Sequence, residues 1–141
     1  MSAKTDGPVL PDSSAWIELF RRTGSATHLS LRKLLVEGAP IVVTEPVVME
    51  LLAGARSSRE YRTTRTALLA FPMLRVENIV TWERASAVWR ACRSAGETAR
   101  DTMDCLIAAV AIREGASVLH RDRDFDVIAR HTELRIEPAI G

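Results

Sequence analysis

Short apolar runs alternate with longer stretches of helical periodicity along this chain, and no two runs are joined by a hairpin turn. The runs lie in PVLP, APIVVT, MLRVENI, SVLH and LRIEP, and each run except the last is followed by a helical stretch. Strands that are separated by helices pair in parallel, because the crossover brings the chain back in the same direction. The pattern therefore predicts an α/β fold, a three-layer sandwich whose mainly parallel central sheet carries helices on both faces.

The helical stretches have recognisable beginnings and ends. Helices are expected at residues 13–20, 25–37, 45–56, 57–71, 81–95, 101–114 and 125–131. Ser13 or Ser14 can cap the first of them, and Gly38 and Gly96 are natural helix ends. The length of 141 residues suits one core, so we expect a single domain spanning residues 1–141.

Composition excludes several classes of protein. No apolar run reaches the roughly 18 residues that a membrane span needs, and the N-terminus does not resemble a signal peptide, so we expect a cytoplasmic protein without membrane contact. Cys92 and Cys105 are too far apart for a redox or zinc motif and are expected to be core thiols. The net charge of +1 gives no overall indication of nucleic acid, although Lys4 and Lys33 are the only lysines beside 17 arginines.

Carboxylates follow two of the expected strands. Asp12 ends the first run, and Asp122 follows SVLH, with Asp124 and Asp126 just beyond. In open parallel sheets, sites form beyond the carboxyl ends of the strands. Each aspartate alone could instead be a helix cap, and Asp126 fits a solvent-facing helix position.

Two further acids lie on apolar helical faces. Glu50 shares a face with Pro46 and Val47, and also with the small Ala53 and Gly54. Burying a carboxylate without a partner costs roughly several kcal/mol of folding free energy. No Lys or Arg lies on this face to act as a partner. Glu45 is a rival position for the same role.

Asp104 has the same unusual setting in DTMDCLIAAVAIREG. It lies on one face with Ile107, Ala108 and Ala111, and Asp101 or Thr102 can serve as the helix cap in its place. The convergence of Asp104 with the acids Asp12, Glu50 and Asp122 would be unfavourable without a cation. Ligands that are all oxygen suit Mg²⁺ or Mn²⁺ better than Zn²⁺.

These four acids, in this order, resemble the pattern of the PIN-domain ribonucleases, and specifically the VapC-type toxins of type II toxin–antitoxin systems. The matching segments are VLPDSSAWI, VVMELLAGAR, DCLIAAVA and LHRDRDF. The resemblance implies a PIN-like fold and a metal site of Asp12, Glu50, Asp104 and Asp122, with Asp124 as a possible fifth member and Ser13 as a supporting hydroxyl. Within this pattern Glu50 is preferred to Glu45, because it precedes LLAG.

The resemblance also implies a function and partners. It implies a Mg²⁺-dependent endoribonuclease, with Mn²⁺ able to substitute, that hydrolyses RNA and thereby inhibits translation and growth. It further implies an antitoxin that occupies a groove beside the acids, and a homodimer of the toxin that forms a hetero-oligomer with it. Four helical aromatic residues could face such partners, but the core is the more common place for Trp16, Phe20, Trp82 and Trp89.

Several arginines are candidates for contact with RNA phosphates. Arg56, Arg59, Arg62 and Arg65 recur every three residues and predict a basic half-face on a helix next to Glu50. The alternative is a solvated face that pairs with acids such as Glu60. Arg121 and Arg123 flank Asp122, where they could contact phosphate or neutralise the acids.

Two rival interpretations remain at this stage. Receiver domains and haloacid-dehalogenase-like phosphatases also have an aspartate after the first strand, but both require a late lysine that this sequence lacks. A catalytically inactive PIN-like module whose acids dock an Arg-rich protein is the second rival. The histidines His28, His120 and His131 are scattered and are expected at surface or capping positions.

Overall fold

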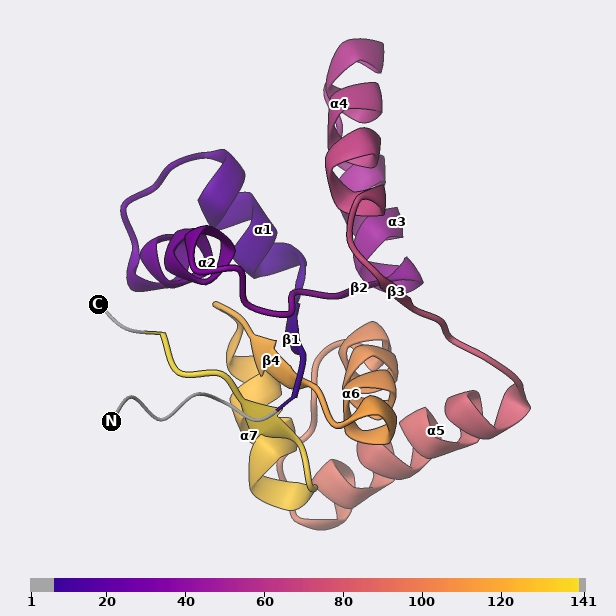
Figure 1. Ribbon diagram of the computed structural model, residues 1–141. Coiled ribbons are helices and arrows are strands. Elements are labelled where there is room, and N and C mark those ends of the chain that lie inside the picture. The colour runs from indigo at the N-terminus through magenta and orange to yellow at the C-terminus, as the bar shows by residue number, and fades with distance from the viewer. Residues whose placement is uncertain (1–6, 140–141) are drawn as a thin grey trace.

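The computed structural model describes residues 7–139 and has a parallel sheet at its centre (Figure 1). The strands are β1 (Val9–Pro11), β2 (Val43–Thr44), β3 (Met73–Leu74), β4 (Ser117–Leu119) and β5 (Arg135–Ile136). β4 pairs with β1 and β5, β2 pairs with β3, and a bridge between Val9 and Ile41 joins the two sets. The order is thus β3-β2-β1-β4-β5 with all pairs parallel, which confirms the predicted sheet.

Helices cover both faces of this sheet, as predicted. They are α1 (Ser13–Phe20), α2 (Ala26–Val36), α3 (Glu45–Ala53), α4 (Ser58–Leu69), α5 (Ile79–Ser94), α6 (Thr102–Glu114) and α7 (Arg123–His131). α1 packs on α2, whereas α5, α6 and α7 pack on one another. Figure 1 shows α1 and α2 on one side of β1 and β4, and α5 and α6 on the other. α3 contacts both α1 and α6, so it lies where the two helical layers approach each other.

The core forms where β1 and β4 meet α6 and α7. Leu10 and Val118 in the two central strands, Ile107 in α6 and Ile128 in α7 are all fully buried. Each such side chain contributes ~1.5–3 kcal/mol by leaving water. α6 is buried at every position from Asp104 to Ala111, which makes it the central helix of the fold.

Four boundaries differ from the sequence prediction. The expected strand at residues 73–79 is only Met73–Leu74, because Asn78 accepts a hydrogen bond from the Val80 amide and starts α5 there. α5 accordingly begins at Ile79 rather than at residue 81. α7 begins at Arg123, because Asp122 is its cap. α3 ends at Ala53, which leaves Arg56 in the turn before α4 rather than on a helix.

α4 is the least supported helix of the fold. Leu68 is its one buried residue, and Figure 1 shows the helix extending away from the sheet beyond α3. A helix with so little buried surface gains little stability from packing. Its exposed sides are therefore available for contacts with other molecules.

Several smaller predictions can be compared with the structure. Gly38 and Gly96 follow helices and have positive φ angles of 70° and 81°, as expected of helix ends. Cys92 and Cys105 are buried free thiols, which confirms their assignment to the core. No helix in the described part of the chain has the length and apolarity to span a bilayer. Lys4 lies outside the described residues.

The aromatic residues divide between core and surface. Trp16 is buried, and its ring centroid lies 5.8 Å from that of Phe20 and 5.5 Å from that of Phe71. Trp89 is partly buried against the core. The core assignment is wrong for Phe20, which is 44% exposed at the end of α1, and for Trp82, which is 51% exposed in the first turn of α5.

Candidate metal centre

Asp12 and Asp122 are brought together by the pairing of β1 with β4. Pro11 is opposite Leu119 in the parallel register, so the turns that follow both strands lie at the same edge of the sheet. Asp12 is 2% exposed and caps α1, and its Oδ1 accepts hydrogen bonds from the Ala15 amide (3.1 Å) and the Ser14 hydroxyl (2.6 Å). Asp122 caps α7 by accepting from the Asp124 amide at 3.0 Å. Both residues are thus helix caps, and Asp12 rather than either serine caps α1. Asp12 is not one of the three carboxylates that converge most closely in the described part of the chain, so its place among the metal ligands stays a prediction.

Asp104 lies at the centre of the acidic site. It is 5% exposed, and its carboxylate has no hydrogen bond or ion pair with any residue that the structure describes. Asp101 is the cap of α6, since its Oδ1 accepts from the Met103 amide at 2.8 Å. One carboxylate oxygen each of Asp104, Asp122 and Asp124 lie within 4.8 Å of one another. A buried carboxylate without a partner is therefore directed at two more carboxylates.

Asp124 links α7 to the loop that leads into α6. It is buried, and its Oδ2 accepts hydrogen bonds from the amides of Arg100 (2.9 Å) and Asp101 (3.2 Å). Its Oδ1 lies 3.8 Å from the Nε of the exposed Arg100 side chain. Asp124 therefore fixes the start of α6 and contributes to the cluster at the same time.

Glu50 stands beside the cluster rather than within it. It is half-buried, and its Oε2 accepts a long hydrogen bond (3.4 Å) from the Ser13 hydroxyl. Its Oε1 is buried without a hydrogen-bond partner among the described residues. The predicted buried face holds for Pro46 and Val47 but is wrong for Ala53 and Gly54, which are exposed because α3 ends at the surface.

Glu45, the rival position, has a structural contact instead. Its side chain is exposed, and its Oε1 accepts a hydrogen bond from the Val76 amide at 2.6 Å. This contact ties the start of α3 to the segment that follows β3. Glu45 is therefore directed away from the acidic site.

The electrostatics show that these acids interact. The pKa of Asp104 is raised to about 8, chiefly by burial and in addition by the charges of Asp122, Asp101, Asp12 and Asp124. Burial also raises the pKa of Asp12 to about 7, with contributions from the charges of Asp122 and Glu50, against the lowering effect of its two hydrogen bonds. Several carboxyl groups thus share one site in which full ionisation is unfavourable.

The pKa of the Glu50 carboxyl is also raised. Burial raises its pKa, and the charges of Asp101 and Asp122 add to this, whereas the Ser13 hydroxyl lowers it. Asp101 is thus electrostatically part of the site, although the sequence pattern did not require it.

The donor set fits a hard divalent cation. The converging atoms are carboxylate oxygens, and they come from Asp104, Asp122 and Asp124. Oxygen ligands suit Mg²⁺ and Mn²⁺, and a cation here would neutralise the charge that the partnerless Asp104 carries into the interior. No histidine or cysteine takes part in the cluster found among the described residues.

The candidate RNA-contacting arginines do not form one stripe. Arg56 and Arg59 line a groove of about 560 Å³ between α1 and the unit of α3 and α4, and Glu50 lines the same groove. Arg62 lies on another side of α4, and Arg65 lines neither pocket beside that helix. The Nε of Arg56 also lies 3.9 Å from the Oε2 of Glu60. This pairing fits the alternative in which Arg56 belongs to a solvated, ion-paired face.

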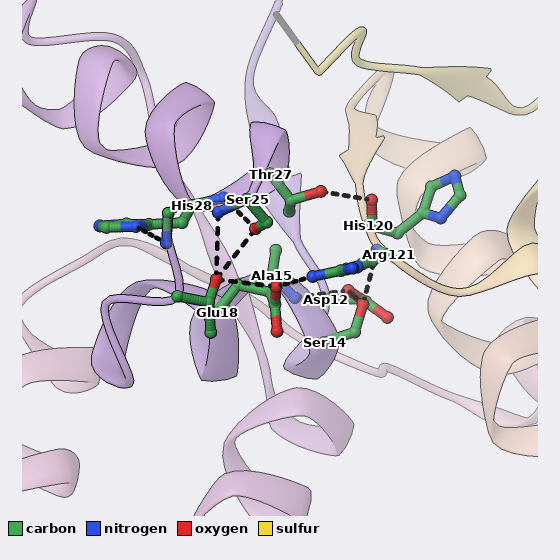
Figure 2. A network of polar contacts seen from close by, with 11 residues as sticks. Asp12, Ser14, Ala15, Glu18, Ser25, Thr27, His28, His120 and Arg121 are labelled. Atoms are coloured by element: carbon green, nitrogen blue, oxygen red, sulfur yellow. Dashed lines mark hydrogen bonds and ion pairs between the residues drawn. The ribbon is translucent and has the colours of Figure 1, made fainter. Parts of the chain in front are cut away.

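The two arginines that flank Asp122 also differ. Arg121 is ion-paired with Glu18 on α1, as Figure 2 shows. Arg123 is exposed and has no hydrogen bond or ion pair with the described residues. Arg123 is therefore the freer of the two to contact a phosphate.

Sequence reasoning missed Ser14 and Arg100. Ser13, the hydroxyl that the sequence pattern singled out, contacts Glu50, whereas the next serine contacts Asp12 (Figure 2). The triplet DSS places both serines beside Asp12, but the local sequence does not show which of them contacts it. No sequence pattern points to Arg100, because only the fold brings its side chain near Asp124.

The histidines have capping contacts, although not all lie at the surface. His28 is buried, and its Nδ1 accepts from the Gly24 amide at 2.9 Å. His120 Nδ1 accepts from the Asp122 amide at 3.0 Å, and its Nε2 lies 3.1 Å from Asp126. His131 contacts Glu97 at 2.8 Å. The prediction of surface or capping positions is thus met by capping at His28 and His120, whereas the partly exposed His131 pairs with the Glu97 side chain.

Comparison with known proteins identifies the family. The model of the PIN domain family matches residues 9–131. The chain belongs to the PIN-domain family. VapC ribonuclease Mb1587 of Mycobacterium bovis is 47% identical over 128 residues, which are 90% of this chain and 96% of that protein. Ribonuclease VapC51 of Mycobacterium tuberculosis is 32% identical over 99 residues, 70% of this chain and 71% of that one. Within the PIN domains, the chain groups with the VapC ribonucleases.

Solved structures of PIN domains have the same fold. A chain in the structure of VapBC2 from Rickettsia felis, bound to a DNA fragment from its promoter, aligns with a TM-score of 0.72 at 15% identity. The alignment covers 92% of this chain and 97% of that one. Mycobacterium tuberculosis VapC20, a sarcin-ricin loop cleaving toxin, aligns with a TM-score of 0.63 at 21% identity, over 90% and 98% of the two chains.

Proposed function

We propose that this PIN domain is a Mg²⁺-dependent endoribonuclease that acts as the toxin of a toxin–antitoxin pair. The observation that carries the proposal is the convergence of Asp104 with Asp122 and Asp124, because Asp104 is only 5% exposed and its carboxylate has no hydrogen-bond or ion-pair partner among the described residues. Burying such a group is costly unless a cation binds it, so its position is explained by function rather than by stability. The relatives named as VapC ribonucleases support RNA as the substrate.

The residues of the site have distinct roles in this proposal. Asp104, Asp122 and Asp124 would hold the metal ion, with Asp12 and Glu50 completing the acidic surroundings. When bound, Mg²⁺ supplies the positive charge that polarises the scissile phosphate and activates water, and Mn²⁺ can replace it. Ser14 donates a hydrogen bond to one oxygen of Asp12 and would restrict the position of this carboxylate.

Basic side chains around the acids would position the RNA. We propose that Arg123 and Arg100, both exposed beside the cluster, and Arg59 in the groove contact phosphates. Arginine suits this role because its planar guanidinium can bind a phosphate through two hydrogen bonds. Arg62 and Arg65 lie away from the groove and are given no such role.

The groove beside Glu50 is the proposed site of the antitoxin. Its walls combine the apolar side chains Ile17, Phe20 and Leu51 with the basic Arg21 and Arg59. Such a surface suits an amphipathic protein segment that carries acidic residues. A segment seated there would lie against Glu50 and block access to the acids. Solved structures with this fold include VapBC toxin–antitoxin complexes, which supports an antitoxin as the partner.

We also propose that the toxin forms a homodimer, which joins the antitoxin in a hetero-oligomer. The first turn of α5 exposes Ile79 (69%), Val80 (47%) and Trp82 (51%). Large apolar side chains gathered in one exposed turn are typical of an interface. A molecular mass in solution equal to that of one chain would contradict the dimer.

The test is cleavage of RNA by the purified protein, freed of antitoxin, with Mg²⁺, with Mn²⁺ and with EDTA. We expect discrete fragments with either metal and none with EDTA or in Asp104→Asn. Asp126→Asn is the matched control, because Asp126 is exposed on α7 and outside the cluster. Absence of cleavage under all conditions, together with absence of metal binding by calorimetry, would favour the inactive binding module instead.

A further inference from the structure

We propose that Glu18 and Arg121 form a positioning pair that holds the two acid-bearing turns of the site in register. The catalytic part of this inference rests on the proposed function. The pair joins α1 to the turn after β4, two segments more than 100 residues apart in sequence (Figure 2). These segments carry Asp12 and Asp122. Arg121 thereby acts on the protein and not on the RNA.

The turn after β4 is anchored to the first part of the chain in four places. The Asp12 amide donates to the Leu119 carbonyl at 3.0 Å, and the Thr27 hydroxyl donates to the His120 carbonyl at 3.3 Å. Arg121 provides the other two contacts: its amide donates to the Ser14 hydroxyl at 2.8 Å, and its guanidinium donates to Glu18. Arg121 is thus held by both its backbone and its side chain, immediately before Asp122.

The Glu18 carboxylate is fixed from several sides. Only 14% of its side chain is exposed, and the Thr23 hydroxyl donates to the same oxygen at 2.9 Å. Hydrogen bonds from Ser25, Arg121 and Thr23 lower its pKa. In an isolated surface ion pair both side chains lose conformational entropy when they pair. The Glu18 carboxylate is already held by other donors, so pairing with Arg121 costs little further entropy on the Glu18 side.

Two consecutive hydrogen bonds connect Arg121 with the Asp12 carboxylate. The Arg121 amide donates to Ser14 Oγ, and Ser14 Oγ donates to Asp12 Oδ1. Release of the guanidinium would loosen the Arg121 amide, the Ser14 hydroxyl and then the Asp12 carboxylate. A displacement of about 1 Å in such a group is enough to cost on the order of 10–100-fold in rate. The pair is therefore expected to affect kcat rather than the binding of RNA.

The experiment compares Glu18→Ala, Arg121→Gln and the double variant with the wild type, because alanine removes the acceptor oxygen that a glutamine would still supply. Glu37→Ala is the matched control, because Glu37 forms an exposed ion pair with Lys33 at the end of α2, away from the site. The hydrogen-exchange rates of the Arg121 and Ala15 amides, measured by NMR, show how firmly the two turns are held, and this measurement does not require an active enzyme. Mn²⁺ affinity, kcat and KM for an oligoribonucleotide report its effect on the site.

We expect both single variants to exchange these amides about tenfold faster, to bind Mn²⁺ more weakly and to lose about tenfold in kcat with KM unchanged. The double variant should be no worse than either single variant, because all three lose the same contact. A higher KM in Arg121→Gln but not in Glu18→Ala would show a direct RNA contact and overturn the proposal, and unchanged amide exchange would also overturn it.

The failure of this inference is distinguishable from failure of the proposed function. A wild-type protein that cleaves RNA, with variants that match it in kcat and amide exchange, would refute the positioning pair alone. A wild-type protein that neither cleaves RNA nor binds Mn²⁺ would refute the nuclease, and the catalytic role of the pair with it.

Discussion

Asp104→Asn should make the metal-free protein more stable at alkaline pH, although it removes activity. The pKa of Asp104 is about 8 in the fold against 3.8 for an exposed aspartate. At 1.36 kcal/mol per unit, ionising it in the folded protein costs ~6 kcal/mol at pH 9. The asparagine amide would be buried without a partner, which costs about 1–3 kcal/mol. The expected net gain for the variant is about 3–5 kcal/mol at pH 9.

The sign of this effect depends on pH. Because the pKa of Asp104 is raised in the fold, the native state binds a proton that the unfolded chain does not hold between about pH 4 and pH 8. The stability of the metal-free wild type therefore falls as pH rises through this range. At pH 5 the folded Asp104 is already neutral, so the advantage of the variant should almost disappear. Mn²⁺ should stabilise the wild type at pH 9 and leave the variant unchanged.

Urea unfolding followed by tryptophan fluorescence, in EDTA at pH 5 and pH 9, measures the difference. The same comparison is made with Asp126→Asn, whose carboxyl is exposed and whose oxygen contact with His120 the amide can keep. This control should show no gain at either pH. If Asp104→Asn loses as much stability at pH 9 as at pH 5, the argument from burial is refuted.

The remaining predictions concern individual contacts of the site and the groove. Glu50→Gln should reduce RNA cleavage at least tenfold, whereas Glu45→Gln should retain it, because the glutamine can still accept from the Val76 amide; initial rates of cleavage measure both. Ser14→Ala should cost about 1–3 kcal/mol in urea unfolding, because the Arg121 amide loses its acceptor. Arg59→Glu should weaken antitoxin binding in calorimetry, and equal weakening by Arg65→Glu would contradict the assignment of the groove.

Local sequence was enough to predict most of the fold. The alternation of strands and helices predicted the parallel sheet, because strand pairing follows from the period of the apolar residues and from the lack of hairpin turns. The ends of strands and helices were harder to predict where the side chain of a capping residue determines where a helix begins. β3 ends at Leu74, five residues before the expected end at residue 79, and Asn78 starts α5 because its side chain accepts a hydrogen bond from the Val80 amide.

The acidic site was predictable for the same physical reason. Asp12 and Asp122 follow adjacent parallel strands, whose carboxyl ends meet at one edge of the sheet, and Asp104 interrupts an otherwise apolar helical face. The roles of these acids, and the single domain spanning residues 1–141, stay predictions until the experiments above are done.

The sequence by itself indicated that Asp104 and Asp122 approach one another, because the periods of helix and strand place them on one face and at one edge. That Asp124 joins these two, whereas Asp12 and Glu50 lie outside the cluster, was decided by the tertiary structure. Only the tertiary structure decided how they are held. Asp124 binds two amides of the loop before α6, and Ser14 rather than Ser13 fixes Asp12. The pairing of Arg121 with Glu18 likewise depends on the packing of segments that are distant in sequence, and no local pattern records such a contact.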